Sequence, residues 1–177
     1  MGEIIIEIYY NLTEEDYINF NLYHIKNSET GKRALALQRF LTPLFFIIIS
    51  YIYSLISEMP FLPLFITFLV TSILWVIFYP KYFYGLIVRN AKKMIKEGKN
   101  DGLLGNHQLK LTEEGLVDTS LNKETKVTWP GITSIRENDG YFFLYNSSVS
   151  AYILPKRELN HVDKVGQYIK SKGVMSE

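Results

Sequence analysis

The side chains that most often carry out chemistry are few in this sequence, and their spacing fits no common site. The three histidines, His24, His107 and His161, fall in separate predicted elements, and the chain contains no cysteine. A structural zinc site needs four ligands at characteristic separations. The sequence also has no P-loop, no dinucleotide-binding glycine motif, no GxSxG and no HExxH. It therefore predicts no metal site, no cofactor and no enzymatic activity.

Two polar clusters resemble catalytic groups only superficially. Glu113 and Glu114 are adjacent carboxylates in a predicted hairpin turn, where neighbouring side chains point apart and stay in water. The serines of residues 147–150 also fall in a predicted turn, where serine is common. We interpret both clusters as turns.

The elements that carry these residues surround one strongly apolar stretch. Residues 41–79 contain a single charged side chain, Glu58, although 21% of the whole sequence is charged. Two runs, 41–57 and 61–79, would form helices about 26 and 28 Å long, against a hydrocarbon core of roughly 30 Å. Residues 58–60 separate the runs with a charge and a proline. We expect a transmembrane helical hairpin, because helices that are apolar on every face would need a larger protein to bury them.

Basic residues flank the predicted hairpin on both sides and are absent from its turn. They are Lys26, Lys32, Arg33 and Arg39 before it, and Lys81, Arg89, Lys92, Lys93, Lys96 and Lys99 after it. The positive-inside rule then predicts a multi-pass protein of the plasma membrane with both termini in the cytoplasm. No ionisable residue lies mid-membrane, which argues against a transporter or a proton relay. The hydroxyl residues of the two helices are expected to pack helices together, within one chain or in a homo-oligomer.

The rest of the chain divides into three segments. Residues 1–40 predict a strand at 3–10, an amphipathic helix at 14–26 that begins with a Thr13–Asp16 capping box, and a basic amphipathic stretch at 32–40. Residues 80–100 predict a basic juxtamembrane stalk helix. Residues 101–177 predict a small antiparallel β domain closed by a C-terminal helix, and the strand at 3–10 could add an edge to it. The fold class is therefore an α+β membrane protein.

Turn signals divide the β domain into strands. The expected strands are 107–112, 116–120, 123–129, 132–137, 141–145 and 149–154. Pro155 is expected to open the last helix, whose apolar stripe is Leu159, Val162, Val165 and Ile169. Trp129 and the aromatic residues 141–145 could stack nucleic-acid bases, but the near-neutral charge of residues 101–177 removes the electrostatic attraction. We therefore expect these aromatic side chains to form the core, and no nucleic-acid binding.

Basic side chains are the remaining candidates for ligand contacts. A basic run beside a membrane attracts anionic lipid headgroups by roughly 1 kcal/mol per charge. Exposed charges that fix orientation and keep the domain soluble are the alternative interpretation. The candidate lipid or partner contacts are Lys92, Lys93, Lys96, Lys123, Lys126, Lys156 and Arg157.

Several of these features occur together in one family. The order of the parts, Trp129 followed by Ile132, the aromatic strand 141–145 and the run 151–157 before the last helix resemble the YcxB-like family of small bacterial membrane proteins. Leu159 departs from the family pattern, which usually has an aromatic residue there. The resemblance implies a pleckstrin-homology-like (PH-like) fold for the C-terminal region and adds no molecular function. A PH-like barrel that binds phosphoinositides generally uses a basic first hairpin, whereas the turn expected in that place, at residues 113–114, is acidic.

The sequence thus predicts a membrane-anchored, non-enzymatic interaction module. A cytoplasmic PH-like domain would bind a protein partner through an exposed sheet edge or an aromatic groove. The alternative is a protein that binds anionic lipid through the basic stalk and Lys156/Arg157.

Overall fold

The computed structural model describes residues 4–97, 102–121 and 123–172. The chain forms two compact units, which we name the β unit (residues 1–20 and 91–177) and the hairpin unit (residues 21–90). From the sequence we divided the chain at residues 40, 79 and 100 instead. The N-terminal strand belongs to the β unit, although it lies about 90 residues before the rest of that unit's sheet in the sequence. Lys99 and the end of the predicted stalk, residues 98–100, lie outside the described residues.

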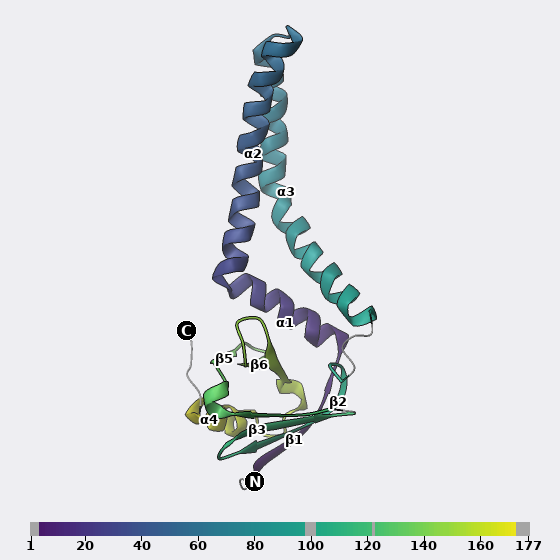
Figure 1. Ribbon diagram of the computed structural model, residues 1–177, viewed down its shortest axis with the longest axis vertical. Coiled ribbons are helices and arrows are strands. Elements are labelled where there is room, and N and C mark those ends of the chain that lie inside the picture. Colours follow the sequence, from purple (N-terminus) through teal and green to yellow (C-terminus); the bar gives the residue numbers. More distant parts are fainter. Residues whose placement is uncertain (1–3, 98–101, 122, 173–177) are drawn as a thin grey trace. The chain divides into compact units, whose positions relative to one another are not determined.

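The larger sheet of the β unit is interrupted in sequence by the whole hairpin unit. Its four antiparallel strands are, in spatial order, β1 (Ile4–Leu12), β2 (Gly105–Thr112), β3 (Gly115–Ser120) and β4 (Lys123–Thr128). Leu12 at the end of β1 pairs with Gly105 at the start of β2 (Figure 1). The prediction that the N-terminal strand adds an edge is therefore confirmed. We had expected the acidic turn at residues 113–114 to be the first connection of the sheet. It joins β2 to β3 instead, because β1 precedes both strands.

The second sheet has three antiparallel strands and is followed by the last helix. Its strands are β5 (Ser134–Glu137), β6 (Tyr141–Tyr145) and β7 (Ala151–Pro155); short 3₁₀ turns lie at η1 (Trp129–Gly131) and η2 (Lys156–Glu158), and α4 spans Val162–Lys172. The prediction that Pro155 opens this helix is wrong. Pro155 ends β7 opposite Tyr141, and the next amide, of Lys156, donates to the carbonyl of Gly140 at 2.8 Å. These pairings keep the chain extended.

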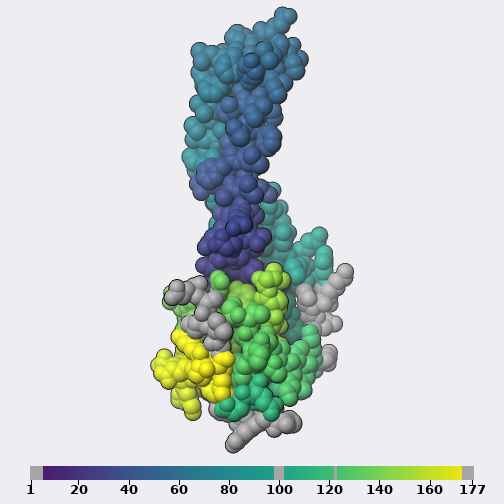
Figure 2. All heavy atoms as spheres, turned by 60° about the vertical axis from the view of Figure 1, so that its left-hand side comes forward, coloured from purple at the N-terminus to yellow at the C-terminus, as the bar shows by residue number. Residues whose placement is uncertain are grey.

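The core of the β unit lies between the two sheets and α4. Fully buried side chains come from every layer: Leu109, Leu111, Leu116, Ile135, Phe142, Phe143, Leu144, Leu154 and Ile169. α4, in yellow in Figure 2, lies against the green segments of the same unit. Gly166 permits this approach, because a Cβ there would lie 2.9 Å from Cζ of Phe142. Trp129 is 7% exposed, and its Nε1 donates to the Thr112 carbonyl at 2.9 Å. The expected core role is confirmed for Trp129, Phe142, Phe143 and Tyr145, whereas Tyr141 is half-buried and donates to Asp16.

Helix α1 (Glu14–Asn27) begins where the sequence predicted it. The Thr13 amide donates to Oδ2 of Asp16 at 2.8 Å, and the Asp16 amide lies 3.3 Å from the Thr13 hydroxyl. This reciprocal pair is the predicted capping box, which satisfies amides that have no partner in the first helical turn.

The hairpin unit contains two long helices, α2 (Glu29–Ser57) and most of α3 (Phe61–Lys96), whose last residues, from Ala91, belong to the β unit. Ser28 caps α2 by accepting from the Gly31 amide at 3.1 Å, and Ser28 alone separates α2 from α1. The stretch 32–40 is part of α2, and residues 80–96 of the predicted stalk are part of α3. Glu58 ends α2 with a left-handed backbone (φ 54°).

The two helices run antiparallel, with their apolar parts side by side (Figure 1). Nε1 of Trp75 donates to the Gln38 carbonyl at 3.1 Å, and the Trp75 ring meets the Phe46 ring edge-on at 6.1 Å. Both helices are long and apolar enough to cross a membrane, and only 6% of the most apolar window of each is buried. Core helices of soluble proteins are mostly buried. These helices therefore present their apolar side chains outward.

Candidate functional site

The predicted contact Lys156 is already paired within the β unit. Its Nζ lies 2.6 Å from Oε1 of Glu137 and over the Phe142 ring at 4.8 Å. Glu137 also binds Lys170, whose Nζ lies 2.6 Å from Oε2. Hydrogen bonds from the two lysines lower the pKa of the Glu137 carboxyl. Lys156 therefore serves to join the end of β7 to β5.

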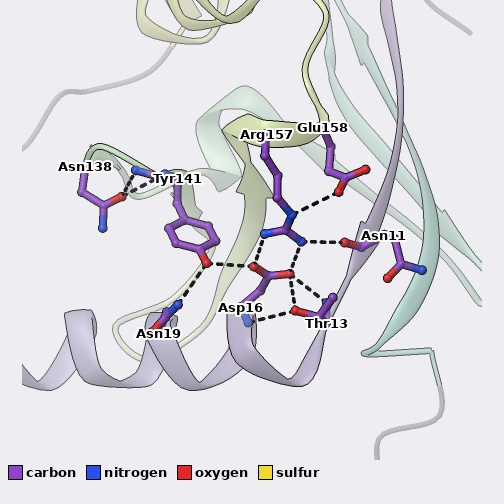
Figure 3. A network of polar contacts seen from close by, with 9 residues as sticks. Asn11, Thr13, Asp16, Asn19, Asn138, Tyr141, Arg157 and Glu158 are labelled. Atoms are coloured by element: carbon purple, nitrogen blue, oxygen red, sulfur yellow. Dashed lines mark hydrogen bonds and ion pairs between the residues drawn. The ribbon is translucent and has the colours of Figure 1, made fainter.

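Arg157, the second predicted contact at this place, forms the centre of a polar network (Figure 3). Its Nη1 and Nη2 bind the two carboxylate oxygens of Asp16 at 2.6 and 2.7 Å. Asp16 is completely buried and also accepts from the Tyr141 hydroxyl at 2.8 Å. Burial raises the pKa of Asp16, but the hydrogen bonds from Arg157, Thr13 and Tyr141 outweigh it and hold the pKa well below its usual range. The guanidinium thus ties α1 to the β7–α4 connection.

The other predicted contacts do not converge. Lys123 and Lys126 lie three residues apart on β4, so their side chains point to opposite faces of the sheet. Of the stalk lysines, Lys92 lies 3.7 Å from a Glu14 oxygen and Lys93 lies 3.7 Å from a Glu97 oxygen. Lys96 is exposed, and no ion pair to it occurs within the described residues. The seven predicted contacts therefore do not form one basic patch.

A polar row crosses the inner face of the larger sheet, beside the apolar side chains that face the core. It consists of one residue from each strand in turn: Tyr10, His107, Asp118 and Thr125. The first three are 5%, 6% and 8% exposed. Buried polar side chains in such a place need partners, because an unpaired one costs roughly 1–3 kcal/mol. The buried side chains of this row therefore need hydrogen-bond partners within the β unit.

Asp118 holds the row together. Its carboxylate accepts from the Tyr10 hydroxyl at 3.2 Å and lies 3.1 Å from Nδ1 of His107. The other ring nitrogen, Nε2, lies 3.3 Å from the Leu103 carbonyl, and the ring stacks on Tyr10 at 5.1 Å between centroids. Burial, with the nearby Asp118 charge, raises the pKa of Tyr10, so this hydroxyl stays protonated and donates. The histidine is fixed on three sides.

The polar row forms the floor of a half-open cleft of about 280 Å³. Ala151, Tyr152 and Ile153 of β7 line it from the other side, and the exposed Lys123 also lines it. The Tyr152 hydroxyl crosses the cleft to Oγ1 of Thr125 at 3.3 Å. Among the described residues no group of three His, Cys, Asp or Glu side chains could hold a metal ion. The cleft can offer a carboxylate, hydroxyl groups and an ammonium group to a small polar ligand.

A second concave surface follows the free edge of β1. Nη2 of Arg157 donates to the Asn11 carbonyl at 3.3 Å, so the Asn11 backbone faces away from β2. Because backbone direction alternates along a strand, the backbone groups of Glu7 and Tyr9 face the same way. No backbone hydrogen bond to them from outside the sheet occurs within the described residues. The edge of β1 from Glu7 to Tyr9 is therefore unpaired.

This edge lies beside a groove of about 320 Å³. The groove runs between β1 and the segment that leads into α4, and it is lined on the β1 side by residues 6–9 and on the other by residues 158–161 with Lys164 and Val165. Ile6, Ile8, Leu159 and Val165 supply its apolar surface. We refer to it below as the β1-edge groove.

The sequence did not reveal either concave surface. His107 and Asp118 are 11 residues apart on neighbouring strands, a separation that fits no local motif. Asp16 and Arg157 are 141 residues apart. An inward-facing histidine in the apolar alternation of β2 was the one available signal for the cleft.

Comparison with known proteins agrees with the resemblance given above. Neither a curated protein nor a solved structure shows significant similarity to the chain. The family model described as YcxB-like protein matches residues 111–164, which extend from the end of β2 into α4. The resemblance to the YcxB-like family is therefore confirmed, over this segment of the chain.

Proposed function

We propose that this protein is a non-enzymatic interaction module anchored in the plasma membrane. The α2–α3 hairpin crosses the bilayer twice, and the β unit is a cytoplasmic PH-like domain that binds a protein partner. The observation that carries the proposal is the insertion of two exposed apolar helices between β1 and β2, which pair with each other directly.

This insertion constrains the topology independently of charge. β1 precedes the hairpin and β2 follows it, and both belong to one sheet. Both ends of the hairpin must therefore lie on the same side of a membrane, which requires an even number of crossings. The flanking lysines and arginines then favour the cytoplasmic side.

The outward side chains of the two helices support insertion into lipid. Leu55, Ile56, Leu62 and Phe78 are all more than 60% exposed. Each buried methylene group contributes about 0.8 kcal/mol on transfer from water, so leaving two such helices in water would cost tens of kcal/mol. A bilayer removes this cost, whereas the rest of the chain does not cover them.

The two antiparallel sheets and the helix that follows them support the PH-like assignment of the β unit. The first strand comes from residues 4–12, ahead of the hairpin, so residues 101–177 supply only part of the fold. For this reason the β unit and the hairpin are expected to fold as one chain, and a fragment that starts at residue 101 would lack an edge strand.

A sheet edge is the better of the two expected partner surfaces. The aromatic groove is not available, because Trp129, Phe142, Phe143 and Tyr145 are buried, and the half-buried Tyr141 donates its hydroxyl to Asp16. The unpaired edge of β1 offers outward backbone groups beside the β1-edge groove, which is lined by both apolar and polar side chains. An extended partner segment with apolar residues at alternate positions would pair with Glu7 and Tyr9 and fill the groove.

Anionic-lipid binding is the second candidate function. It is favoured by Lys81, Arg89 and Lys96 of α3, for which the described residues supply no ion pair. Lys156 and Arg157 do not support it, since both are paired inside the β unit.

Photo-crosslinking in native membranes tests the proposed function. A photoreactive phenylalanine analogue at position 9 should give one discrete protein adduct, and the same analogue at exposed position 124 should not. Glu7→Pro removes an outward amide without removing a ladder hydrogen bond, so it should abolish the adduct, whereas Glu7→Ala should keep it. An adduct that survives Glu7→Pro, or none from position 9, contradicts the proposal.

A further inference from the structure

The cleft between the larger sheet and β7 is lined by two side chains of opposite charge, one buried and one exposed. Asp118 lines it with 8% exposure, and Lys123, which also lines it, is exposed to solvent. Lys123 shares the face of β4 with Thr125, which points into the cleft, because the two are two residues apart. Within the described residues no ion pair to Lys123 occurs. A ligand in the cleft would therefore meet a carboxylate inside and an ammonium group outside.

The carboxylate in the floor has capacity for a further donor. A carboxylate has about four acceptor positions. The Tyr10 hydroxyl and Nδ1 of His107 make three contacts with it, at 3.1 to 3.3 Å. The Tyr10 hydroxyl donates to Asp118, and His107 does so in the tautomer that carries its proton on Nδ1; in that state neither neighbour can serve an incoming anion at that point. The floor of the cleft thus selects a hydrogen-bond donor, and most strongly a positively charged one.

The size of the cleft limits the ligand to a small molecule. Its volume of about 280 Å³ lies just below the range of roughly 300–1,000 Å³ that is usual for ligand pockets. Leu12, Leu103 and Ile153 supply apolar walls in addition to the two charged side chains. Such walls suit a short aliphatic linker between a cation and an anion.

We infer that this cleft binds a small zwitterion that carries a primary ammonium group and an anionic group, of the phosphoethanolamine type. The ammonium group donates to the buried Asp118, and the anionic group meets the exposed Lys123. Such a zwitterion exists both as a free molecule and as the headgroup of a phospholipid. The inference does not depend on the protein partner proposed above.

Calorimetric titration of the full-length protein in dodecyl maltoside tests the inference. Phosphoethanolamine should bind once per chain. Phosphocholine, which has no N–H donor, and inorganic phosphate should each bind about tenfold more weakly or worse. Equal affinity for inorganic phosphate, or no binding of phosphoethanolamine at millimolar concentration, would overturn the inference.

Three variants locate the site. Asp118→Asn should weaken phosphoethanolamine binding about tenfold, and Lys123→Ala, at an exposed position, about threefold. Lys126→Ala, on the opposite face of the same strand, is the matched control and should leave affinity unchanged. An affinity that is unchanged in folded Asp118→Asn, or equally reduced in Lys126→Ala, contradicts the assignment.

Nanodiscs distinguish the two sources of the zwitterion. Full-length protein is placed in discs of phosphatidylcholine alone or with phosphatidylethanolamine. Competition by the second lipid, seen as weaker apparent binding of added phosphoethanolamine, identifies the lipid headgroup as the natural ligand. Equal binding in both discs identifies the free zwitterion. Either result supports the shared chemistry, whereas no binding in either disc contradicts it.

Discussion

Asp16→Asn should destabilise the β unit by about 2–3 kcal/mol at pH 7. The Asp16 carboxylate is completely buried and accepts five hydrogen bonds of 2.6 to 2.8 Å, from Thr13, Tyr141 and Arg157. Breaking a buried ion pair typically costs 3–5 kcal/mol, because one charge is left without compensation. Here the Arg157 side chain is 47% exposed, so water can solvate the remaining charge and the expected cost falls below that range.

The pH dependence of this effect has a defined sign. The pKa of Asp16 is lower in the folded protein than its ordinary value near 4 in the unfolded chain. The stabilisation by the carboxylate is therefore fully present above about pH 4 and is lost as the pH falls through the folded value. The stability difference between wild type and Asp16→Asn should narrow only below about pH 4.

Urea unfolding of the full-length protein in detergent, followed by Trp129 fluorescence, measures this effect. The second tryptophan, Trp75, is replaced by phenylalanine in every variant so that the signal reports the β unit. Glu124→Gln, an exposed position on β4, is the control and should leave the unfolding midpoint unchanged. In a double-mutant cycle with Arg157→Gln, the double variant should lose less than the sum of the single losses. The reasoning would be refuted if the two single losses simply add, or if Asp16→Asn is as stable as the wild type at pH 7.

Two further substitutions probe the packing of the β unit. Gly115→Ala would place a Cβ 2.1 Å from the Val127 carbonyl oxygen, so we expect a loss of about 2 kcal/mol or more in thermal unfolding; a stability equal to wild type would contradict the close approach. Trp129→Phe keeps an aromatic ring but removes the donor to the Thr112 carbonyl, so urea unfolding followed by circular dichroism should show a loss of about 1–2 kcal/mol, and no loss would mean that this hydrogen bond is unimportant.

Local sequence signals predicted many of the elements. The run at residues 3–10 and the Thr13–Asp16 pair identified β1 and the start of α1, because strand alternation and helix capping act over a few residues. The long apolar runs identified α2 and α3, because the length and composition of a membrane-spanning helix are also properties of a continuous stretch of sequence. Pro155 was misinterpreted as a helix start, since proline also ends strands, and its pairing with Tyr141 depends on a strand that is distant in sequence.

The contacts that define the candidate sites could not be predicted from sequence. Any of the acidic residues of the chain could have neutralised Arg157, and nothing near residue 157 identifies Asp16 as its partner. The same holds for His107 and Asp118, which meet only because β2 and β3 pair in one register. The sequence suggested Lys123 and Lys126 as joint contacts, but a separation of three residues on a strand places them on opposite faces.

Single-cysteine labelling in intact cells tests the central claim most directly. The natural chain has no cysteine, so Glu58→Cys in the hairpin turn and Lys172→Cys at the end of α4 can each be labelled without background. A membrane-impermeant maleimide should react with position 58 in intact cells and with position 172 only after lysis. Reaction of both positions from the same side, or recovery of the protein in the soluble fraction without detergent, would contradict a membrane hairpin that returns to a cytoplasmic β unit.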